Sequence, residues 1–247
     1  MSAPLLAVEQ VSRRFGGLVA LREVSFEVPQ GQIVGLVGPN GAGKTTLFNV
    51  LVGLHAPTSG TVRLAGRRLD GLPPHRVCAA GLTKTFQNVA LFLDMTVEDN
   101  VLVGGLARHG VAGARALAAR VLEQVGLSSI AGKLAADLTF PERARVELAR
   151  ALCTEPRVLL LDEVMAALTH VEMDELLALV RRLREGGLTV LVVEHHMRAI
   201  LSLCDRILVL NFGELIADGA PQEVVHDERV VTAYLGRGAA AREARDG

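Results

Sequence analysis

The sequence is poor in aromatic residues and carries almost no net charge. Of its 247 residues only 3% are aromatic, with seven Phe, one Tyr and no Trp, and the formal net charge is −1. Proteins that bind nucleic acid usually present a basic surface, and those that bind single strands also use aromatic side chains on which the bases stack. Because neither feature is present, we expect no nucleic-acid partner.

Cysteine and long apolar runs are also scarce. The cysteines, Cys78, Cys153 and Cys204, are widely separated and odd in number, which argues against a disulfide framework and favours a reducing compartment. They and the histidines show no zinc-ligand spacing. No apolar run approaches the ~20 residues that span a bilayer, and we find no signal-peptide pattern at the N-terminus. Since the mean hydropathy is still +0.34, we expect an apolar surface that meets a partner.

One short segment predicts a ligand directly. Residues 38–46 read Gly-Pro-Asn-Gly-Ala-Gly-Lys-Thr-Thr and fit the phosphate-binding pattern G-x-x-x-x-G-K-[ST]. The apolar run at 33–37 predicts a strand before the loop, and residues 44–52 predict a helix after it. In such a loop backbone N–H groups surround phosphate oxygens, Lys44 contacts the β- and γ-phosphates, and the Thr45 hydroxyl ligates Mg²⁺. The sequence therefore predicts a site for a nucleoside triphosphate.

The order of the remaining patterns indicates an α/β fold. Strands are predicted at 5–11, 18–28, 33–37, 61–64, 82–86, 158–161, 188–193 and 207–210. Helices are predicted at 44–52, 112–125, 171–184 and 196–203. Such alternation implies a parallel sheet, with antiparallel strands before it and a helical insert in the middle. We expect a core of residues 1–87 and 153–236, a helical insert at 88–152 and a flexible tail at 237–247.

An acidic pair follows a later buried strand. Asp162 and Glu163 come directly after Val158–Leu161. Asp162 is expected to hold Mg²⁺ through water, and Glu163 to orient or deprotonate the attacking water. Taken alone, such a pair is more often a solvated strand end. The phosphate loop upstream makes the functional interpretation the better one.

Two further side chains are weaker candidates for the same site. His195 ends the strand predicted at 188–193 and could lie beside the γ-phosphate, although His196 competes with it and a strand-end histidine is often structural. Gln87 follows the strand at 82–86 and could reach Mg²⁺ or the attacking water. A single Gln in a loop carries little weight by itself.

Together these residues resemble the ATP-binding subunit of ABC transporters over nearly the whole chain. By that resemblance Phe15 stacks on adenine, residues 38–46 are Walker A, Gln87 lies in the Q-loop, 138–152 is the signature region, 158–163 is Walker B and His195 is the switch histidine. The resemblance implies a P-loop NTPase with a mixed sheet core, an N-terminal antiparallel β subdomain and an inserted α-helical subdomain.

The resemblance also implies ATP and Mg²⁺ as cofactors. The residues then expected to bind nucleotide are Phe15, Gly38, Pro39, Asn40, Gly41, Ala42, Gly43, Lys44, Thr45, Thr46 and Thr139. The expected catalytic residues are Lys44, Gln87, Glu163 and His195. The expected metal ligands are Thr45, Gln87 and Asp162.

Several segments look more specifically like the branched-chain amino acid importer subfamily: 15–19, 85–88, 95–98, 161–165, 193–195 and 230–236. This implies an ATP-driven importer for branched-chain or other amino acids or small polar solutes. The implied partners are transmembrane permease subunits, a second ATPase subunit and, indirectly, an extracytoplasmic solute-binding protein. We favour a heterodimer of ATPase subunits, cytoplasmic and peripheral on the inner face of the cell membrane.

The signature motif departs from the family pattern. Where Leu-Ser-Gly-Gly-Gln is usual, this chain has Leu138-Thr-Phe-Pro-Glu142. In the family the segment opens a helix that faces the γ-phosphate bound by the opposing subunit. Thr139 keeps a hydroxyl, but Pro141 has no N–H and Glu142 brings a carboxylate. The same residues form a capping box with proline in the first turn, so the helix should still start here.

A second departure lies in the D-loop, where residues 166–169 end in Thr instead of Asp or Asn. A Thr there weakens the hydrogen bond expected across the dimer. These changes suggest an asymmetric dimer. This chain's Walker motifs would form a competent site against a partner with an intact signature, and Thr139–Glu142 would complete a weaker second site.

The apolar segment Asn88–Met95 has two interpretations. It could receive a short helix of the permease, or Leu91, Phe92 and Leu93 could pack the helical insert.

Other functions were compared with the transporter subunit. A guanine-specifying Asn-Lys-x-Asp is absent, which excludes a P-loop GTPase, and no basic surface supports DNA repair. The alternative function is a non-transport ABC protein, a regulatory nucleotide switch with a degenerate signature.

Overall fold

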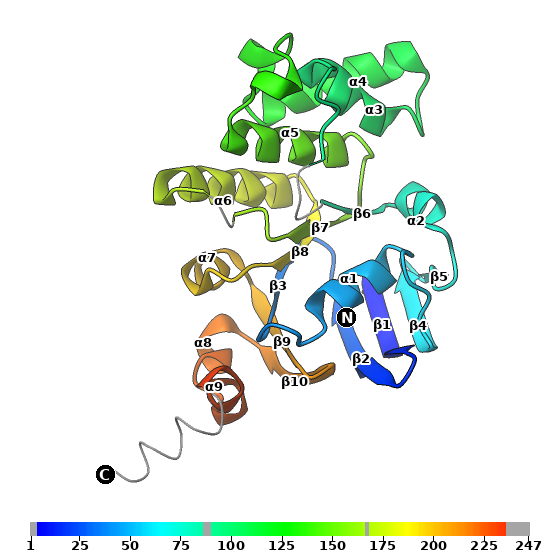
Figure 1. The fold of residues 1–247 in the computed structure, drawn as a ribbon, viewed down its shortest axis with the longest axis vertical. Coiled ribbons are helices and arrows are strands. Elements are labelled where there is room, and N and C mark those ends of the chain that lie inside the picture. The colour runs from blue at the N-terminus through cyan, green and yellow to red at the C-terminus, as the bar shows by residue number, and fades with distance from the viewer. Residues whose placement is uncertain (1–3, 86–89, 166–167, 236–247) are drawn as a thin grey trace.

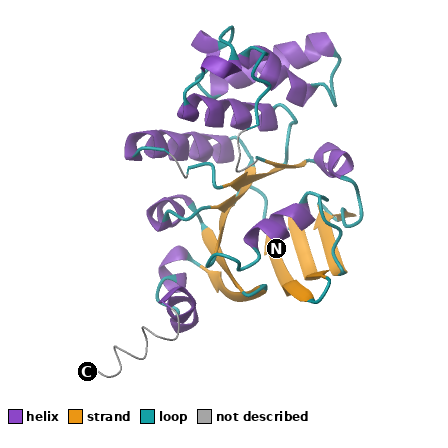
Figure 2. Cartoon of the chain, in the orientation of Figure 1, coloured by secondary structure: helices purple, strands orange, loops and turns teal. Residues whose placement is uncertain are grey.

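The computed structural model of the chain describes residues 4–85, 90–165 and 168–235. Two β-sheets form one part of the molecule, and a group of helices forms the other (Figures 1 and 2). The larger sheet has six strands in the order β10-β9-β3-β8-β7-β6, and only β9 and β10 pair antiparallel. Its strands are β3 (Ile33–Val37), β6 (Leu82–Lys84), β7 (Val158–Asp162), β8 (Thr189–Val193), β9 (Arg206–Asn211) and β10 (Glu214–Gly219).

The smaller sheet is antiparallel and comes from the N-terminal part of the chain. Its order is β2-β1-β4-β5, with β1 at Leu6–Phe15, β2 at Leu18–Val28, β4 at Ser59–Leu64 and β5 at Arg67–Arg68. Helix α1 (Lys44–Leu51) packs with this sheet and with one face of the larger one, since Phe48, Val8 and Val34 belong to one buried cluster. The phosphate-loop helix is therefore enclosed between two sheets.

The other face of the six-stranded sheet is covered by α6 (His170–Glu185) and α7 (Met197–Leu203). Along β3 the side chains alternate between the two faces: Val34 and Leu36 join the α1 cluster, whereas Ile33 and Val37 join the α6 and α7 cluster. Because both faces are buried, β3, β7 and β8 are continuous apolar runs, as expected for a parallel sheet.

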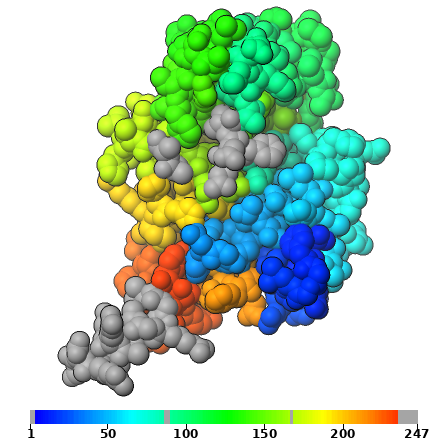
Figure 3. Space-filling view, viewed as in Figure 1, coloured from blue at the N-terminus to red at the C-terminus, as the bar shows by residue number. Residues whose placement is uncertain are grey.

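Residues between β6 and β7 form the helical part at the top of Figures 1 and 3. It contains α3 (Val97–Gly105), α4 (Val111–Gln124), the short 3₁₀ helices η1 (Ser128–Ile130) and η2 (Ala135–Asp137), and α5 (Phe140–Leu152). Its apolar side chains continue the cluster beneath α6 without a break. Among the described residues, no helix combines the length and apolarity that a membrane crossing requires.

The predicted fold class is confirmed: a P-loop α/β core with a mixed sheet, an antiparallel β subdomain and an inserted helical subdomain. Some elements were missed or shortened in the prediction. β1 runs on to Phe15, whereas the prediction ended at residue 11. The prediction was too short because register shifts after Val8 and Val11 break the alternation of side chains along the strand. The prediction also lacked the strands β5 and β10, the helices α2 (Pro74–Ala80), α8 (Pro221–Val224) and α9 (Glu228–Leu235), and the 3₁₀ helices η1 and η2.

Several predicted segments end differently in the structure or lie outside its described part. The strand predicted at 82–86 ends earlier, at Lys84, and Thr85 follows it outside the strand; residue 86 lies outside the described part of the chain. The tail predicted at 237–247 also lies outside it. The strand predicted at 207–210 forms a hairpin with β10, which pairs antiparallel with β9.

Candidate nucleotide-binding site

The phosphate loop joins β3 to α1, and two of its glycines cannot be replaced without moving the backbone. Gly38 has φ +150°, and a Cβ there would lie 2.0 Å from the carbonyl oxygen of Leu210. Gly43 has φ +108°, and its Cβ would lie 2.7 Å from the carbonyl oxygen of Ala20. The first turn of α1 contains no acidic side chain, so the positive end of its dipole is available to an anion.

Lys44 is the first residue of α1 and is buried beneath this loop. Its Nζ donates to the carbonyl oxygens of Gly38, at 2.7 Å, and Pro39, at 3.1 Å. Burial lowers the pKa of the ammonium, while the nearby carboxylates of Glu163 and Asp162 act in the opposite direction. The lysine thus sits against the loop backbone with the acidic pair close enough to act on it.

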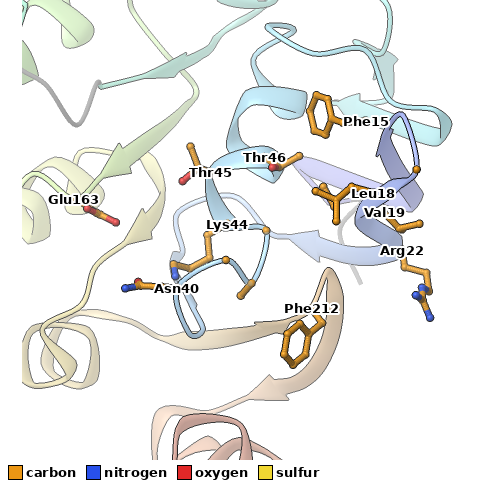
Figure 4. A pocket seen from close by; sticks show the side chains of 15 residues that line it. Phe15, Leu18, Val19, Arg22, Asn40, Lys44, Thr45, Thr46, Glu163 and Phe212 are labelled. Carbon is orange, nitrogen blue, oxygen red and sulfur yellow. The ribbon is translucent and has the colours of Figure 1, made fainter. Parts of the chain in front are cut away.

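The loop forms the centre of an open cavity of about 710 Å³. Figure 4 shows Lys44 and Asn40 at its middle, Phe15 and Phe212 on opposite sides, and Glu163 across the gap. Of the predicted nucleotide-binding residues, the lining contains Phe15, Asn40, Gly41, Ala42, Gly43, Lys44, Thr45 and Thr46. Gly38 and Pro39 contribute the loop backbone that Lys44 holds.

Phe15, the predicted adenine platform, is held in place by two neighbours. The guanidinium carbon of Arg13 lies 4.4 Å from the centre of its ring, and the His55 ring meets it edge-on at 5.2 Å. Arg13 is itself fixed by a hydrogen bond to the carbonyl oxygen of Ala56. Phe15 therefore presents a positioned aromatic surface at the edge of the cavity.

Glu163 and His195 are brought together by the pairing of β7 with β8. In that parallel pair Asp162 lies beside Val193, so the residues that follow leave the sheet at the same edge. His195 Nε2 lies 2.7 Å from Glu163 Oε1, and a carboxylate only accepts, so the imidazole donates. His196 is instead the exposed N-cap residue of α7.

The backbone of Glu163 is in an unusual conformation. Its φ is +53°, in the left-handed region that non-glycine residues seldom adopt, and its N–H donates to the carbonyl oxygen of Val193. The hydrogen bond to β8 helps to hold this conformation. Because such strain costs roughly 1–3 kcal/mol and persists only where the surroundings impose it, it is typical of functional positions.

Comparison with known proteins places this arrangement in a family. A family model described as "ABC transporter" matches residues 21–166, and one described as "Branched-chain amino acid ATP-binding cassette transporter" matches residues 214–240. The chain belongs to the ABC transporter ATP-binding family. It is therefore an ATP-binding subunit whose ATPase activity is coupled to transport.

Individual relatives cover nearly the whole chain. The high-affinity branched-chain amino acid transport ATP-binding proteins BraF of Pseudomonas aeruginosa and LivG of Salmonella typhimurium are each 42% identical over 96% of this chain and 99% of their own. The ADP conformation of MJ1267, an ATP-binding cassette of an ABC transporter, superposes with a TM-score of 0.87. That match is 28% identical and covers 96% of this chain and all of the other.

The Walker B aspartate of this ABC subunit has a partner that the sequence analysis missed. Lys84 Nζ lies 2.7 Å from Asp162 Oδ2, and only 7% and 3% of the two side chains are exposed. The available signal in the sequence was a charged residue, Lys84, inside the strand predicted at 82–86. Sequence reasoning also missed the Arg13 and Phe212 side chains beside the cavity.

A second missed residue, Glu194, lies between Walker B and the switch histidine. It is 3% exposed; Met165 N–H donates to its Oε1 at 2.8 Å, and Oε2 has no hydrogen-bond partner among the described residues. Burial raises the pKa of Glu194 to about 7, an effect that the N–H groups of Met165 and His195 reduce and Glu163 and Asp162 increase. A glutamate between Val193 and His195 was the available signal.

The signature segment of this ABC subunit has the predicted capping box. Thr139 is the N-cap of α5; its N–H and its hydroxyl both donate to Glu142 Oε2, at 2.7 and 3.1 Å. Lys133 Nζ also donates to Glu142 Oε2, at 3.2 Å. The Thr139 N–H and then the Lys133 ammonium hold the pKa of Glu142 below its usual range, against the effect of burial. The carboxylate is therefore turned back onto its own helix.

Some predicted residues are not brought to this site. Thr139 does not line the cavity among the described residues, in keeping with a role toward another subunit. Thr169 of the D-loop is used as the N-cap of α6, with its hydroxyl donating to Glu172 Oε2 at 2.7 Å. Gln87 and residues 166–167 lie outside the described residues.

The side chains present fit Mg²⁺. Thr45 and Asp162 offer hydroxyl and carboxylate oxygens, the donors that Mg²⁺ prefers. Among the described residues no group of three His, Cys, Asp or Glu side chains could hold a metal by itself. That agrees with an ion bound by one or two protein oxygens, with nucleotide phosphates and water as its other ligands.

Proposed function

We propose that this ABC subunit hydrolyses Mg²⁺–ATP on the cytoplasmic face of the cell membrane to drive import of branched-chain or other amino acids or small polar solutes. The observation that carries the proposal is the 42% identity to BraF and LivG over 96% of the chain. The match of residues 214–240 to the branched-chain model supports the same solute class. The proposal includes the division into a core of 1–87 and 153–236, an insert at 88–152 and a tail at 237–247.

Nucleotide binding would use the features described above. Phe15 stacks on the adenine, the backbone of residues 38–46 surrounds the phosphates, and Lys44 exchanges its contacts with the loop carbonyls for phosphate oxygens. The first turn of α1 has no acidic side chain, and this favours the exchange because no carboxylate offsets the positive end of the helix dipole. Thr45 and Asp162 would hold Mg²⁺, which would supply positive charge to neutralise the phosphates.

For the chemical step, Glu163 orients the attacking water and accepts its proton. His195 donates to Glu163 Oε1 and so would fix the orientation of this carboxylate toward the water. This arrangement makes His195 a positioning residue for the glutamate in the nucleotide-free subunit, in addition to the predicted role beside the γ-phosphate. Gln87 completes the proposed catalytic set.

The proposed partners are a second, non-identical ATPase subunit, permease subunits and, indirectly, an extracytoplasmic solute-binding protein. In a head-to-tail dimer Thr139 would approach the nucleotide of the other subunit. The apolar segment before α3 supports a permease contact: Leu91 packs into the core, whereas Phe92 and Leu93 are 51% and 48% exposed. Asn100 holds this segment by hydrogen bonds to the backbone N–H and carbonyl of Phe92. The two interpretations of the segment thus apply to different side chains.

Transport in a purified system tests the proposal. The chain is produced together with candidate permease and second ATPase subunits, placed in proteoliposomes, and supplied with ATP on the subunit side. We expect leucine uptake that needs the solute-binding protein and stops with Glu163→Gln, while Glu185→Gln, a change at an exposed carboxylate, leaves uptake intact. A chain that binds ATP but does not associate with any permease would favour the regulatory switch instead.

A further inference from the structure

The Lys84 ammonium links three parts of the site. Besides Asp162 at the end of β7, Nζ contacts Asn49 of α1, donating to its Oδ1 at 3.2 Å. It also lies 5.8 Å from the centre of the Phe48 ring on the same helix. Lys84 itself ends β6, which runs beside β7 (Figure 1). One cation thus connects the Walker A helix, Walker B and the strand that leads into residues 85–88.

The next residue fixes the backbone of the same aspartate. Thr85 N–H and its hydroxyl both donate to the carbonyl oxygen of Leu160, at 2.9 and 3.3 Å, and Asp162 N–H donates to Thr85 Oγ1 at 3.2 Å. Lys84 and Thr85 therefore hold Asp162 by its side chain and by its backbone. Two consecutive residues at the end of β6 decide where the Walker B carboxylate lies.

The Lys84 ammonium and the proposed Mg²⁺ would both bind the Asp162 carboxylate. A buried carboxylate is unfavourable without a positive partner, and Lys84 supplies that partner before any nucleotide arrives. Mg²⁺ requires the same carboxylate, and a hydrated dication must share it with the ammonium or displace the ammonium toward other acceptors such as Asn49. The two cations therefore compete for one anion.

We propose that Lys84 is a positioning residue that holds the Asp162 carboxylate in the nucleotide-free subunit and competes with Mg²⁺ for it. The inference rests on the proposed role of Asp162 in Mg²⁺ binding. Removing the ammonium has two opposite consequences. The empty subunit loses stability because a buried carboxylate is left without its partner, and Mg²⁺ binds more tightly because its competitor is gone.

The test measures Mg²⁺ binding and stability without relying on turnover. ATP binding to the full chain carrying Glu163→Gln is followed by calorimetry over a series of Mg²⁺ concentrations, and thermal unfolding is measured without nucleotide. With Lys84→Met added, we expect a lower unfolding temperature and an Mg²⁺ midpoint about tenfold lower, which corresponds to about 1.4 kcal/mol. Lys84→Arg, which keeps the charge, should stay near the parent protein in both measurements.

Two further variants make the outcomes distinct. Arg68→Met breaks an exposed ion pair of similar length, with Asp70, and should leave the Mg²⁺ midpoint unchanged. If Lys84→Met does not fold, Lys84→Gln, which keeps a donor toward Asp162 without the charge, should lower the midpoint in its place. An unchanged or raised midpoint overturns the inference. If Asp162→Asn raises the midpoint while the Lys84 variants do not lower it, only this inference fails; if Asp162→Asn changes nothing, the proposed metal site fails.

Discussion

The imidazole of His195 donates a hydrogen bond to the carboxylate of Glu163 across the ends of two neighbouring parallel strands, with 2.7 Å between Nε2 and Oε1. Glu163 lies at the edge of the nucleotide cavity, and its backbone is held in the left-handed region. His195 and Glu163 therefore form one hydrogen-bonded unit. Loss of either side chain should affect the chemical step more than the binding of ATP.

Glu163→Gln should abolish ATP hydrolysis and preserve ATP binding, because the amide cannot accept a proton. His195→Ala should lower kcat by about 100-fold or more and change KM little, since general-base catalysis is worth 10²–10⁴-fold. Phosphate release and calorimetry with ATP measure the two effects. His196→Ala is the matched control, because that side chain is exposed at the start of α7. An equal loss in the His196 variant would contradict the assignment of the switch histidine.

Hydrolysis in the assembled dimer should be asymmetric. Because Thr139 and Glu142 are tied up in a capping box, the site that this chain's signature completes should contribute less turnover. Glu163→Gln in this chain should stop hydrolysis in the complex, whereas the same change at the partner subunit's Walker B glutamate should cost much less. The ATPase rates of the two mutant complexes test this prediction. Equal losses of ATPase activity would contradict the asymmetry hypothesis but not the proposed transport function.

Gly38→Ala should weaken ATP binding at least tenfold. The new methyl group would lie 2.0 Å from the carbonyl oxygen of Leu210, and the required φ of +150° strains any L-residue by about 1–3 kcal/mol. The loop must shift, which moves the amides that face the phosphates. Gly132→Ala is the control, because a Cβ there meets nothing within 4 Å and Gly132 does not line the cavity. Calorimetry with ATP compares the two variants; retained affinity in Gly38→Ala would show that the loop tolerates a Cβ.

Glu194 should make the subunit less stable as the pH rises from about 5 to 8. Its pKa is about 7 in the folded chain against 4.5 as the ordinary value, so the folded state binds the proton more tightly. The free energy of unfolding then falls as the pH rises through this window, by about 3 kcal/mol in total. The stabilisation is fully present below pH 4.5 and is lost above pH 7.

Glu194→Gln should flatten that dependence, because its amide oxygen still accepts from Met165 N–H and carries no charge. Urea unfolding at several pH values between 5 and 8 measures the difference. The variant should match the parent protein near pH 5 and exceed it at pH 8. Glu185→Gln, an exposed carboxylate, should leave the slope unchanged. Parallel profiles for the parent and the Glu194 variant would mean that this carboxyl does not titrate in the window.

Much of the site could be predicted because its signals are local. The phosphate loop is one contiguous segment, and its glycines and Lys44 must follow one another for the backbone to curve around phosphate. Asp162 and Glu163 were predicted at a strand end, and His195 at the end of the next. That these ends meet followed from the parallel pairing of β7 with β8, but the contact between the two side chains did not.

Nucleotide chemistry, the α/β order of the elements and the likeness to the ABC family could all be predicted, because each depends on residues close together in the chain. The environment of the charged side chains could not, because it depends on how distant segments pack. Lys84 meets Asp162 and Asn49, residues that are far from it in sequence, only because β6 pairs with β7 beside α1. Glu194 is a buried carboxyl group that accepts a hydrogen bond from the N–H of Met165, a residue far from it in sequence. Burial and ion pairing depend on contacts between distant segments, and periodicity along one segment carries no information about them.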